Sequence, residues 1–235
     1  MNGANIHFKN YKGILLDLDN TLYNYEKCHK AAIEKALGSI SESVGVKQSI
    51  LEEAFNAARK ELHIELSNSA SSHNRMLYFQ RMFERIGLNP LTYTLEAYNL
   101  YWDHFLDILD YDEGAEDFLK SLKGKQICLI TDLTVHIQHR KIQKLKLDRY
   151  IDAIVTSEEA GREKPHPYIF LLALKKLGLS PSEIIMVGDN YSRDVLGAVN
   201  LGISCIWLNR EKKSECSSNK LVTEIQRISD LMKYV

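Results

Sequence analysis

The sequence predicts an α/β protein with a doubly wound, Rossmann-like parallel sheet that is interrupted by an inserted all-helical domain. Two observations support this fold class. Short, continuous apolar runs alternate with helical patterns along much of the chain, which is typical of parallel strands buried on both faces. Between residues 22 and 110, amphipathic helical patterns follow one another without a convincing strand. We therefore expect right-handed βαβ units around a helical insertion.

Five apolar runs rich in Ile, Val and Leu mark the predicted strands, at residues 13–18, 126–131, 153–156, 184–187 and 203–208. Apolar residues at helical spacing follow three of these runs, at residues 135–145, 165–177 and 192–200. Pro165 stands at the start of the second of these helices, because the first turn tolerates proline, and Gly178 stands at its end.

The inserted segment contains four predicted helices, at residues 26–37, 47–66, 73–86 and 91–109. Gly38, the serine-rich stretch 67–72 and the turn 87–90 separate them. Nine basic and twelve acidic residues give the segment a charge of −3, which offers no cationic surface for a polyanion. We therefore expect an α/β core formed by residues 1–21 and 111–235 and a helical insertion formed by residues 22–110.

The composition is that of an ordinary globular protein of 235 residues. It has 30 basic and 31 acidic side chains, a formal charge of −1, which disfavours a nucleic-acid-binding protein. The hydrophobic fraction is 45% and the charged fraction 26%, as in folded domains. No run approaches the roughly 18 apolar residues of a membrane helix, and the polar N-terminus does not resemble a signal peptide. We expect neither a nucleic-acid nor a membrane partner.

The cysteines are dispersed and form no C-x-x-C pair; they are Cys28, Cys128, Cys205 and Cys216. Two of them lie within apolar runs, which favours buried reduced thiols over disulfides or zinc ligands. The sequence therefore predicts a cytoplasmic protein.

Aromatic residues such as Trp102 and Trp207 are compatible with packing inside one chain or across a dimer, so a monomer and a homodimer both stay open.

Two carboxylates, Asp17 and Asp19, follow the first predicted strand directly. In an open parallel sheet, ligands bind beyond the carboxyl ends of the strands, so both carboxylates are expected at the functional edge. Their spacing lets both project toward one site while Leu18 points into the core. Two close anions need a divalent cation or a shared proton to offset their repulsion. The alternative is a strand-to-loop turn in which Asp and Asn serve only as turn formers.

A second acidic cluster follows the fourth predicted strand. Gly188 lets the backbone turn tightly and delivers Asp189 to the same edge. Asp194 falls in the first turn of the next helix, where the macrodipole alone favours an acidic residue. Without a bound ion, it is hard to explain why these carboxylates meet the first pair at one edge of the sheet. A set of oxygen-only ligands suits Mg²⁺.

Two further strand ends carry groups suited to a phosphate. Thr131 ends the second strand at the head of a helix whose free amides favour an anion. Lys164 follows the third strand, in a loop just before Pro165. A lone loop lysine is usually solvated, but its place beside the other strand ends favours a phosphate contact.

In chain order, these residues resemble the four motifs of the haloacid dehalogenase superfamily of aspartate-nucleophile phosphohydrolases: Asp17 and Asp19, Thr131, Lys164, and Asp189 with Asp194. The resemblance covers nearly the whole chain. The helical insertion resembles the C1 cap of subfamily I, and the run 157–170 is similar to the branch that includes N-acylneuraminate-9-phosphatase. The resemblance implies a Mg²⁺-dependent phosphatase that acts on a small phosphomonoester through an aspartyl-phosphate.

The resemblance also implies a role for each acidic residue. Asp17 matches the nucleophile that takes the phosphoryl group. Asp19 matches the general acid and base, a role that requires partial protonation near neutral pH. Mg²⁺ would be held by Asp17, by the backbone carbonyl of Asp19 and by Asp189. Asp194 would bind the ion through water or orient the other ligands.

The implied phosphate-binding residues are Thr131, Asp132 and Lys164. The second motif departs from the family pattern, because Asp132 and Leu133 stand where many relatives have Asn and often Gly. We expect the Asp132 carboxylate to face away from a phosphate, which it would repel, while its backbone amide contributes. Thr21 is expected to be a structural hydroxyl that fixes the loop.

Three other functions stay open at this point. A phosphomutase and a haloacid dehalogenase would use the same Asp nucleophile, although a dehalogenase needs no metal and usually lacks the second aspartate. A catalytically idle binding domain is the third.

Six residues of the insertion are candidates for contact with the substrate: Tyr23, Asn24, Tyr25, His73, Asn74 and Arg75. The alternative, which is the more common role of such residues, is hinge packing for the tyrosines and a solvated helix start for His73 and Arg75. The charge of the insertion favours a compact metabolite, such as a sugar phosphate or nucleoside monophosphate.

Overall fold

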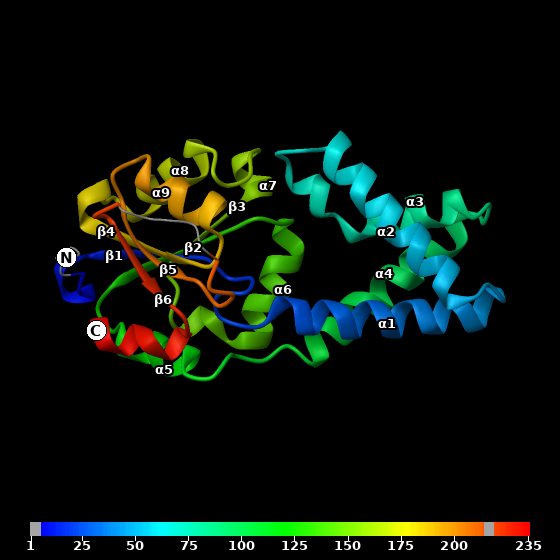
Figure 1. Cartoon of the computed structure of the whole chain (residues 1–235), viewed down its shortest axis with the longest axis horizontal. Helices are drawn as coiled ribbons and strands as arrows, with labels where there is room; N and C mark the ends of the chain where they lie inside the picture. Colours follow the sequence, from blue (N-terminus) through cyan, green and yellow to red (C-terminus); the bar gives the residue numbers. More distant parts are fainter. Residues whose placement is uncertain (1–5, 214–218) are drawn as a thin grey trace.

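The computed structural model describes residues 6–213 and 219–235. In these residues one parallel sheet has the strand order β3-β2-β1-β4-β5-β6. The strands are β1 (Gly13–Leu16), β2 (Gln126–Thr131), β3 (Ala153–Thr156), β4 (Ile184–Gly188), β5 (Ser204–Leu208) and β6 (Val222–Ile225). Helices cover both faces of the sheet, and a group of longer helices extends from one end of the molecule (Figure 1). The predicted fold class, a doubly wound α/β sheet with a helical insertion, is confirmed.

The strands β1 to β5 form at the continuous apolar runs. Every residue of β1 and of β4 is buried. Thr131 pairs with Thr156, so β2 and β3 end together, whereas Leu16 pairs with Leu129 and Val187, so β2 and β4 extend two residues and one residue beyond the end of β1. β1 lies between β2 and β4. Because all neighbours run parallel, the residues that follow these strands meet at one edge of the sheet.

Two apolar clusters hold helices against the faces of the sheet. One lies under α8 (Pro167–Leu177) and α9 (Leu196–Val199). The other includes buried residues of α5 (Ala115–Ser121) and α6 (Val135–Leu145), and it continues into the helical insertion. A one-turn helix, α7 (Ser157–Ala160), follows β3 directly. In Figure 1, α8 and α9 lie on one side of the strands, and α5 lies on the other.

The helical insertion consists of α1 (Tyr25–Val44), α2 (Gln48–Glu65), α3 (Arg75–Arg85) and α4 (Pro90–Asp107). Each of α1, α3 and α4 begins after an asparagine whose side chain accepts a backbone N–H of the first turn. Aromatic residues fill the space between α1, α3 and α4; they include Phe79, Tyr101, Trp102 and Phe105. The insertion therefore has an apolar core that is continuous with one face of the sheet.

Several predicted boundaries are wrong for identifiable reasons. Gly38 does not break the first helix, because α1 runs through it and ends before Gly45, whose φ of 69° suits glycine. Pro165 does not start a helix: it follows Lys164 in a cis peptide, and α8 begins at Pro167 behind His166, whose ring accepts the N–H of Tyr168.

The elements that were not predicted include α5 and β6. α5 has apolar residues at helical spacing, but it is short and stands next to a strong strand pattern. β6 is an edge strand with only Ile225 buried, so it lacks the continuous apolar run that marks the other strands.

Three of the cysteines, Cys28, Cys128 and Cys205, are buried and unpaired. Cys216 lies outside the residues that the structure describes. Within the described ranges, no helix has the length and apolar character needed to cross a membrane.

His29 of α1 makes the stability of the insertion sensitive to acid. Its ring stacks on Tyr25, and its Nδ1 lies 2.8 Å from the hydroxyl of Tyr101. Burial, assisted by the cations of Arg75 and Arg59, lowers the pKa of His29 to about 3. The unfolded chain therefore binds a proton below about pH 6.5 that the folded chain excludes, so stability falls as the pH drops through that value.

We predict that His29→Gln removes part of this acid sensitivity. Between pH 7 and pH 5 the free energy of unfolding of the wild type should fall by about 1–2 kcal/mol more than that of the variant. Urea unfolding at both pH values measures the difference. His139→Gln, at an exposed position on α6, is the matched control and should lose stability in parallel with the wild type. Equal slopes for His29→Gln and the wild type would contradict the prediction.

Candidate active site

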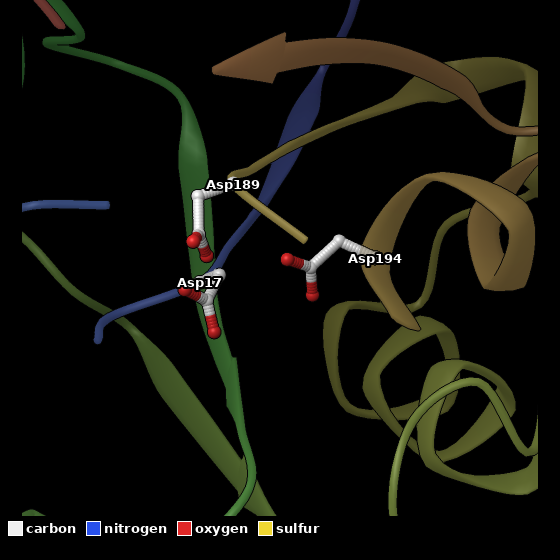
Figure 2. Close-up of side chains that lie close together, drawn as sticks. All are labelled: Asp17, Asp189 and Asp194. Carbon is white, nitrogen blue, oxygen red and sulfur yellow. The ribbon is translucent and has the colours of Figure 1, made fainter. Parts of the chain in front are cut away.

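Three carboxylates meet at the carboxyl edge of the sheet. Asp17 follows β1, Asp189 follows β4, and Asp194 lies in the π-helical turn Tyr191–Val195. One oxygen from each lies within 4.8 Å of the others. Figure 2 shows the carboxylate of Asp194 reaching from its helical turn toward Asp17 and Asp189. An all-oxygen set of this kind fits a hard divalent cation.

Lys164 supplies the positive charge in this cluster. Its Nζ lies 2.6 Å from Oδ1 of Asp17 and 2.7 Å from Oδ1 of Asp194, and it donates to the carbonyl of Ile130 at 3.0 Å. The hydroxyl of Thr21 donates to the other oxygen of Asp17 at 2.8 Å. Thr21 therefore orients Asp17, in keeping with the structural role expected for it.

One ammonium does not balance three carboxylates, of which Asp17 and Asp194 are buried and Asp189 is partly buried. Burial raises the pKa of Asp17, and the charges of Asp194 and Asp189 raise it further against the opposing effect of Lys164. Burial and the charge of Asp194 likewise raise the pKa of Asp189 to about 7. The cluster therefore needs a proton or a cation to hold its three carboxylates at neutral pH.

Position 188 requires a glycine because the side chain of Asp194 packs directly against it. A Cβ at this position would meet Oδ2, Cγ and Cβ of Asp194 at 2.5, 2.6 and 2.7 Å. The φ of Gly188 does not lie in the left-handed region, so backbone strain is not the reason for a glycine at this position. Its missing side chain is what lets Asp194 approach the end of β4.

Asp19 lies beside the carboxylate cluster and is held by different partners. Nζ of Lys141 lies 2.7 and 2.9 Å from its two carboxylate oxygens, and the hydroxyl of Tyr23 donates to Oδ1 at 2.5 Å. Burial acts to raise the pKa of Asp19, but the Lys141 charge and the hydrogen bonds outweigh it, so that pKa is lowered. The expectation of a partly protonated Asp19 is therefore wrong for this arrangement, because Lys141 stabilises the anion.

Thr131 ends β2 and Asp132 follows it, and both residues line the same pocket. Oγ1 of Thr131 accepts a hydrogen bond from Gln138 at 2.7 Å. Asp132 accepts the backbone N–H of Lys164 at 3.0 Å and pairs with Arg193 at 3.1 Å. Asp132 lines the pocket, and Arg193 pairs with its carboxylate and offsets its charge. That this carboxylate faces away from a bound phosphate stays a prediction.

The pocket of about 180 Å³ is lined by strand-end residues on one side and by residues of the helical insertion on the other. Tyr25, His73 and Arg75 line it, as the sequence suggested, and Arg59 does so as well. Two further candidates, Asn24 and Asn74, instead cap helices α1 and α3. Tyr23 is fully buried behind Asp19.

A cluster of polar contacts ties the insertion to the core beside this pocket. Glu163 of the core accepts a hydrogen bond from Ser72 at 3.0 Å, and it lies 3.0 Å from Nε2 of His73. Arg193 approaches the same carboxylate at 3.6 Å. These contacts fix the 3₁₀ turn Ala70–His73 over the strand ends.

Sequence patterns did not single out Lys141, Gln138 or Arg59. Lys141 and Gln138 are both fully buried on α6. A signal was present, because Lys141 stands four residues after Ile137 and four before Leu145, on the apolar stripe of an amphipathic helix. A polar residue in the middle of such a stripe needs a buried partner. Arg59 carries no comparable signal, since basic residues are common on exposed helix faces.

The comparisons with known proteins indicate one family. The model of the haloacid dehalogenase-like hydrolases matches residues 11–202. A ribulose-1,5-bisphosphate 5-phosphatase of Halopiger xanaduensis is 34% identical, over 91% of this chain and 92% of the relative. A glyceraldehyde 3-phosphate phosphatase of Pyrococcus furiosus is 30% identical, over 94% and 93%.

The branch suggested by the sequence is also found. The N-acylneuraminate-9-phosphatase of Rattus norvegicus is 32% identical over 49% of this chain and 47% of the relative. Among solved structures, a haloacid dehalogenase-type phosphatase from Thermococcus onnurineus has a TM-score of 0.71 at 24% identity, covering 94% of this chain and 96% of that one. The last likeness shows the shared fold.

We predict that Gly188→Ala destabilises the protein, because the new methyl group must displace the Asp194 carboxylate. The expected loss is about 1–3 kcal/mol in the free energy of unfolding, measured by urea denaturation. Gly38→Ala is the matched control: it lies within α1 with no close neighbour, apart from Gln48 at 3.6 Å, and should raise stability by about 0.5–1 kcal/mol. A Gly188→Ala variant as stable as the wild type would contradict the close approach.

Proposed function

The chain belongs to the haloacid dehalogenase-like hydrolases, and we propose that it is a phosphatase that uses Asp17 as nucleophile and Mg²⁺ as cofactor to hydrolyse a small phosphomonoester. The observation that carries this proposal is the meeting of Asp17, Asp189, Asp194 and Lys164 at one buried point of the sheet edge. The curated relatives named above are phosphatases, which agrees with that chemistry.

In the proposed first step, a carboxylate oxygen of Asp17 bonds to phosphorus and the bond from phosphorus to the substrate oxygen breaks, which leaves a phosphoryl group on Asp17. Thr21 holds the Asp17 carboxylate in place, and Lys164 offsets the charge of the transferred group. Mg²⁺ held by Asp17, Asp189 and the carbonyl of Asp19, with Asp194 behind them, would neutralise the carboxylates and polarise the phosphoryl oxygens.

Asp19 would move the proton in both steps. It donates to the leaving oxygen in the first step and takes a proton from the attacking water in the second, when the phosphoryl group passes from Asp17 to water. Lys141 keeps Asp19 ionised in the free protein, so Asp19 must gain a proton before it can act as the acid of the first step. The negative charge of a phosphate dianion bound beside Asp19 raises the pKa of Asp19 and favours that protonation.

We further propose that residues 22–110 act as a cap that closes over the core formed by residues 1–21 and 111–235. Closure would exclude water from the phosphoryl group and place Tyr25, His73 and Arg75 against the substrate. Thr131, Asp132 and Lys164 would bind the phosphate. The substrate class is a sugar phosphate or nucleotide-like metabolite, and the names of the relatives favour a sugar phosphate. The buried, unpaired thiols support a cytoplasmic location.

We predict that the wild type releases phosphate from small phosphomonoesters in the presence of Mg²⁺, and that excess chelator abolishes the release. Asp17→Asn should lower kcat by at least about 10³-fold, because the amide is a poor nucleophile. A malachite-green screen across metabolite classes measures both effects. Asp103→Asn, at an exposed position of α4, is the matched control and should leave kcat unchanged. An active Asp17→Asn variant would contradict the assignment; halide release that survives chelation would identify a dehalogenase instead.

Lys141 is predicted to position Asp19. Lys141→Met fits the apolar surroundings but removes the partner of both Asp19 oxygens, so kcat/KM should fall by roughly 10- to 100-fold. The affinity for Mg²⁺, measured by calorimetry, should stay unchanged, which separates this effect from a general loss of the site. Lys175→Met, at an exposed position of α8, is the control. Full activity in Lys141→Met would show that Asp19 needs no such partner.

A further inference from the structure

The basic side chains that line the pocket differ in whether a carboxylate lies within ion-pair distance of them. Lys164 pairs with Asp17 and Asp194. His73 and Arg193 both approach Glu163, and Arg193 also pairs with Asp132. Among the described residues, no carboxylate lies within ion-pair distance of Arg59 or Arg75. The uncompensated positive charge of the pocket therefore belongs to the insertion.

Arg75 is the more unusual of the two arginines. Arg75 is 5% exposed, and its guanidinium donates to the carbonyl of His73 and to the hydroxyls of Tyr25 and Tyr101, whereas its Nε has no hydrogen-bond partner among the described atoms. Aromatic rings surround it at 5.4 to 5.9 Å: those of Tyr25, Tyr78, Tyr101 and Trp102. A buried arginine is usually paired with an anion. Ring faces replace only part of that stabilisation.

Arg59 brings a second guanidinium to the same wall of the pocket. It projects from α2, while Arg75 stands at the start of α3. Arg59 is partly exposed and makes no hydrogen bond to any described residue, so its donors are available to a ligand. Two guanidinium groups facing one small pocket repel each other unless an anion lies between or beside them. Their planar forks suit phosphate and carboxylate oxygens.

We propose that Arg59 and Arg75 form a second anion subsite, which binds a negatively charged group of the substrate other than the phosphate that is removed. This inference rests on the proposed function, since it assumes that the scissile phosphate lies at Asp17 and Lys164. The second group is a phosphate or a carboxylate at the far end of a compact molecule. The subsite gives the enzyme a preference for substrates that are charged at both ends.

The distribution of charge supports this division of the pocket. The core side carries five carboxylates, those of Asp17, Asp19, Asp132, Asp189 and Asp194. The insertion side carries none among its lining residues, which are Tyr25, Arg59, His73 and Arg75. A substrate with one phosphate and a neutral end would leave Arg59 and Arg75 without a counterion. A substrate with a second anion would neutralise them once the pocket is closed to water.

The experiment compares phosphate release from matched pairs of substrates. Glycerol 3-phosphate against 3-phosphoglycerate tests a carboxylate, and fructose 6-phosphate against fructose 1,6-bisphosphate tests a second phosphate. The wild type should have a kcat/KM at least about tenfold higher for the doubly charged member of a pair, corresponding to one hydrogen-bonded ion pair. Which pair shows the preference identifies the second group.

Arg59→Gln should remove most of this preference by raising KM for the doubly charged substrate roughly tenfold, while kcat/KM for its neutral-ended partner changes by less than about threefold. Arg75→Gln should act in the same direction and is read with its thermal stability, because Arg75 is also buried. Lys60→Gln, an exposed neighbour of Arg59 on α2, is the control and should keep the wild-type preference.

Three outcomes overturn the inference. The first is a wild type that prefers the neutral-ended members, and the second is an Arg59→Gln variant that loses activity equally on both members of a pair. The third is Lys60→Gln behaving like Arg59→Gln, which would indicate a general effect of surface charge. Release of no phosphate from any of the substrates would instead count against the proposed function as well, so the two failures are distinguishable.

Discussion

The repulsion among buried carboxylates at the edge of the sheet is the constraint on which the rest of the structure depends. Parallel strands deliver Asp17 and Asp189 to one point, and Gly188 admits Asp194 to the same point. Lys164 offsets part of the charge. Burial, followed by the charge of Asp194, raises the pKa of Asp189 to about 7, and the negative charge that stays uncompensated creates the need for a cation. Thr21 holds the Asp17 carboxylate in place, and the loop that carries Lys164 brings its ammonium group to this cluster.

Periodicity and strand-end chemistry predicted most of the core from the sequence. Continuous apolar runs identify strands buried on both faces, so five of the strands were found, while β6 at the exposed edge was not. The acidic residues of the cluster were predicted because they follow parallel strands, and the carboxyl ends of parallel strands meet at one edge of the sheet. Lys141 was missed although its place on the apolar stripe of α6 signals a buried partner, because the stripe does not identify that partner as Asp19. Arg59 was missed because its place at the pocket depends on how separate helices pack, which local patterns do not contain. The pairing of Asp132 with Arg193 was not predicted, because the two residues are 61 positions apart in the chain.

Net charge says little about the charges that a ligand meets in the pocket. The insertion has a charge of −3, which suggested no cationic surface for a polyanion. The acidic side chains of the insertion do not line the pocket, whereas Arg59 and Arg75 do. Electrostatic selectivity is set by the few charges that a ligand meets in a desolvated pocket rather than by the sum over a domain.

The central claim is that the carboxylate cluster holds Mg²⁺ as the ion that balances its charge. Calorimetric titration of the wild type with Mg²⁺ at pH 7, in two buffers of different ionisation enthalpy, tests it most directly. We predict stoichiometric binding with release of protons, because the raised pKa of Asp189 leaves it partly protonated before the ion arrives. Asp189→Asn should bind Mg²⁺ more weakly and release fewer protons. A wild type that binds no Mg²⁺, or binds it without displacing protons, would contradict this account.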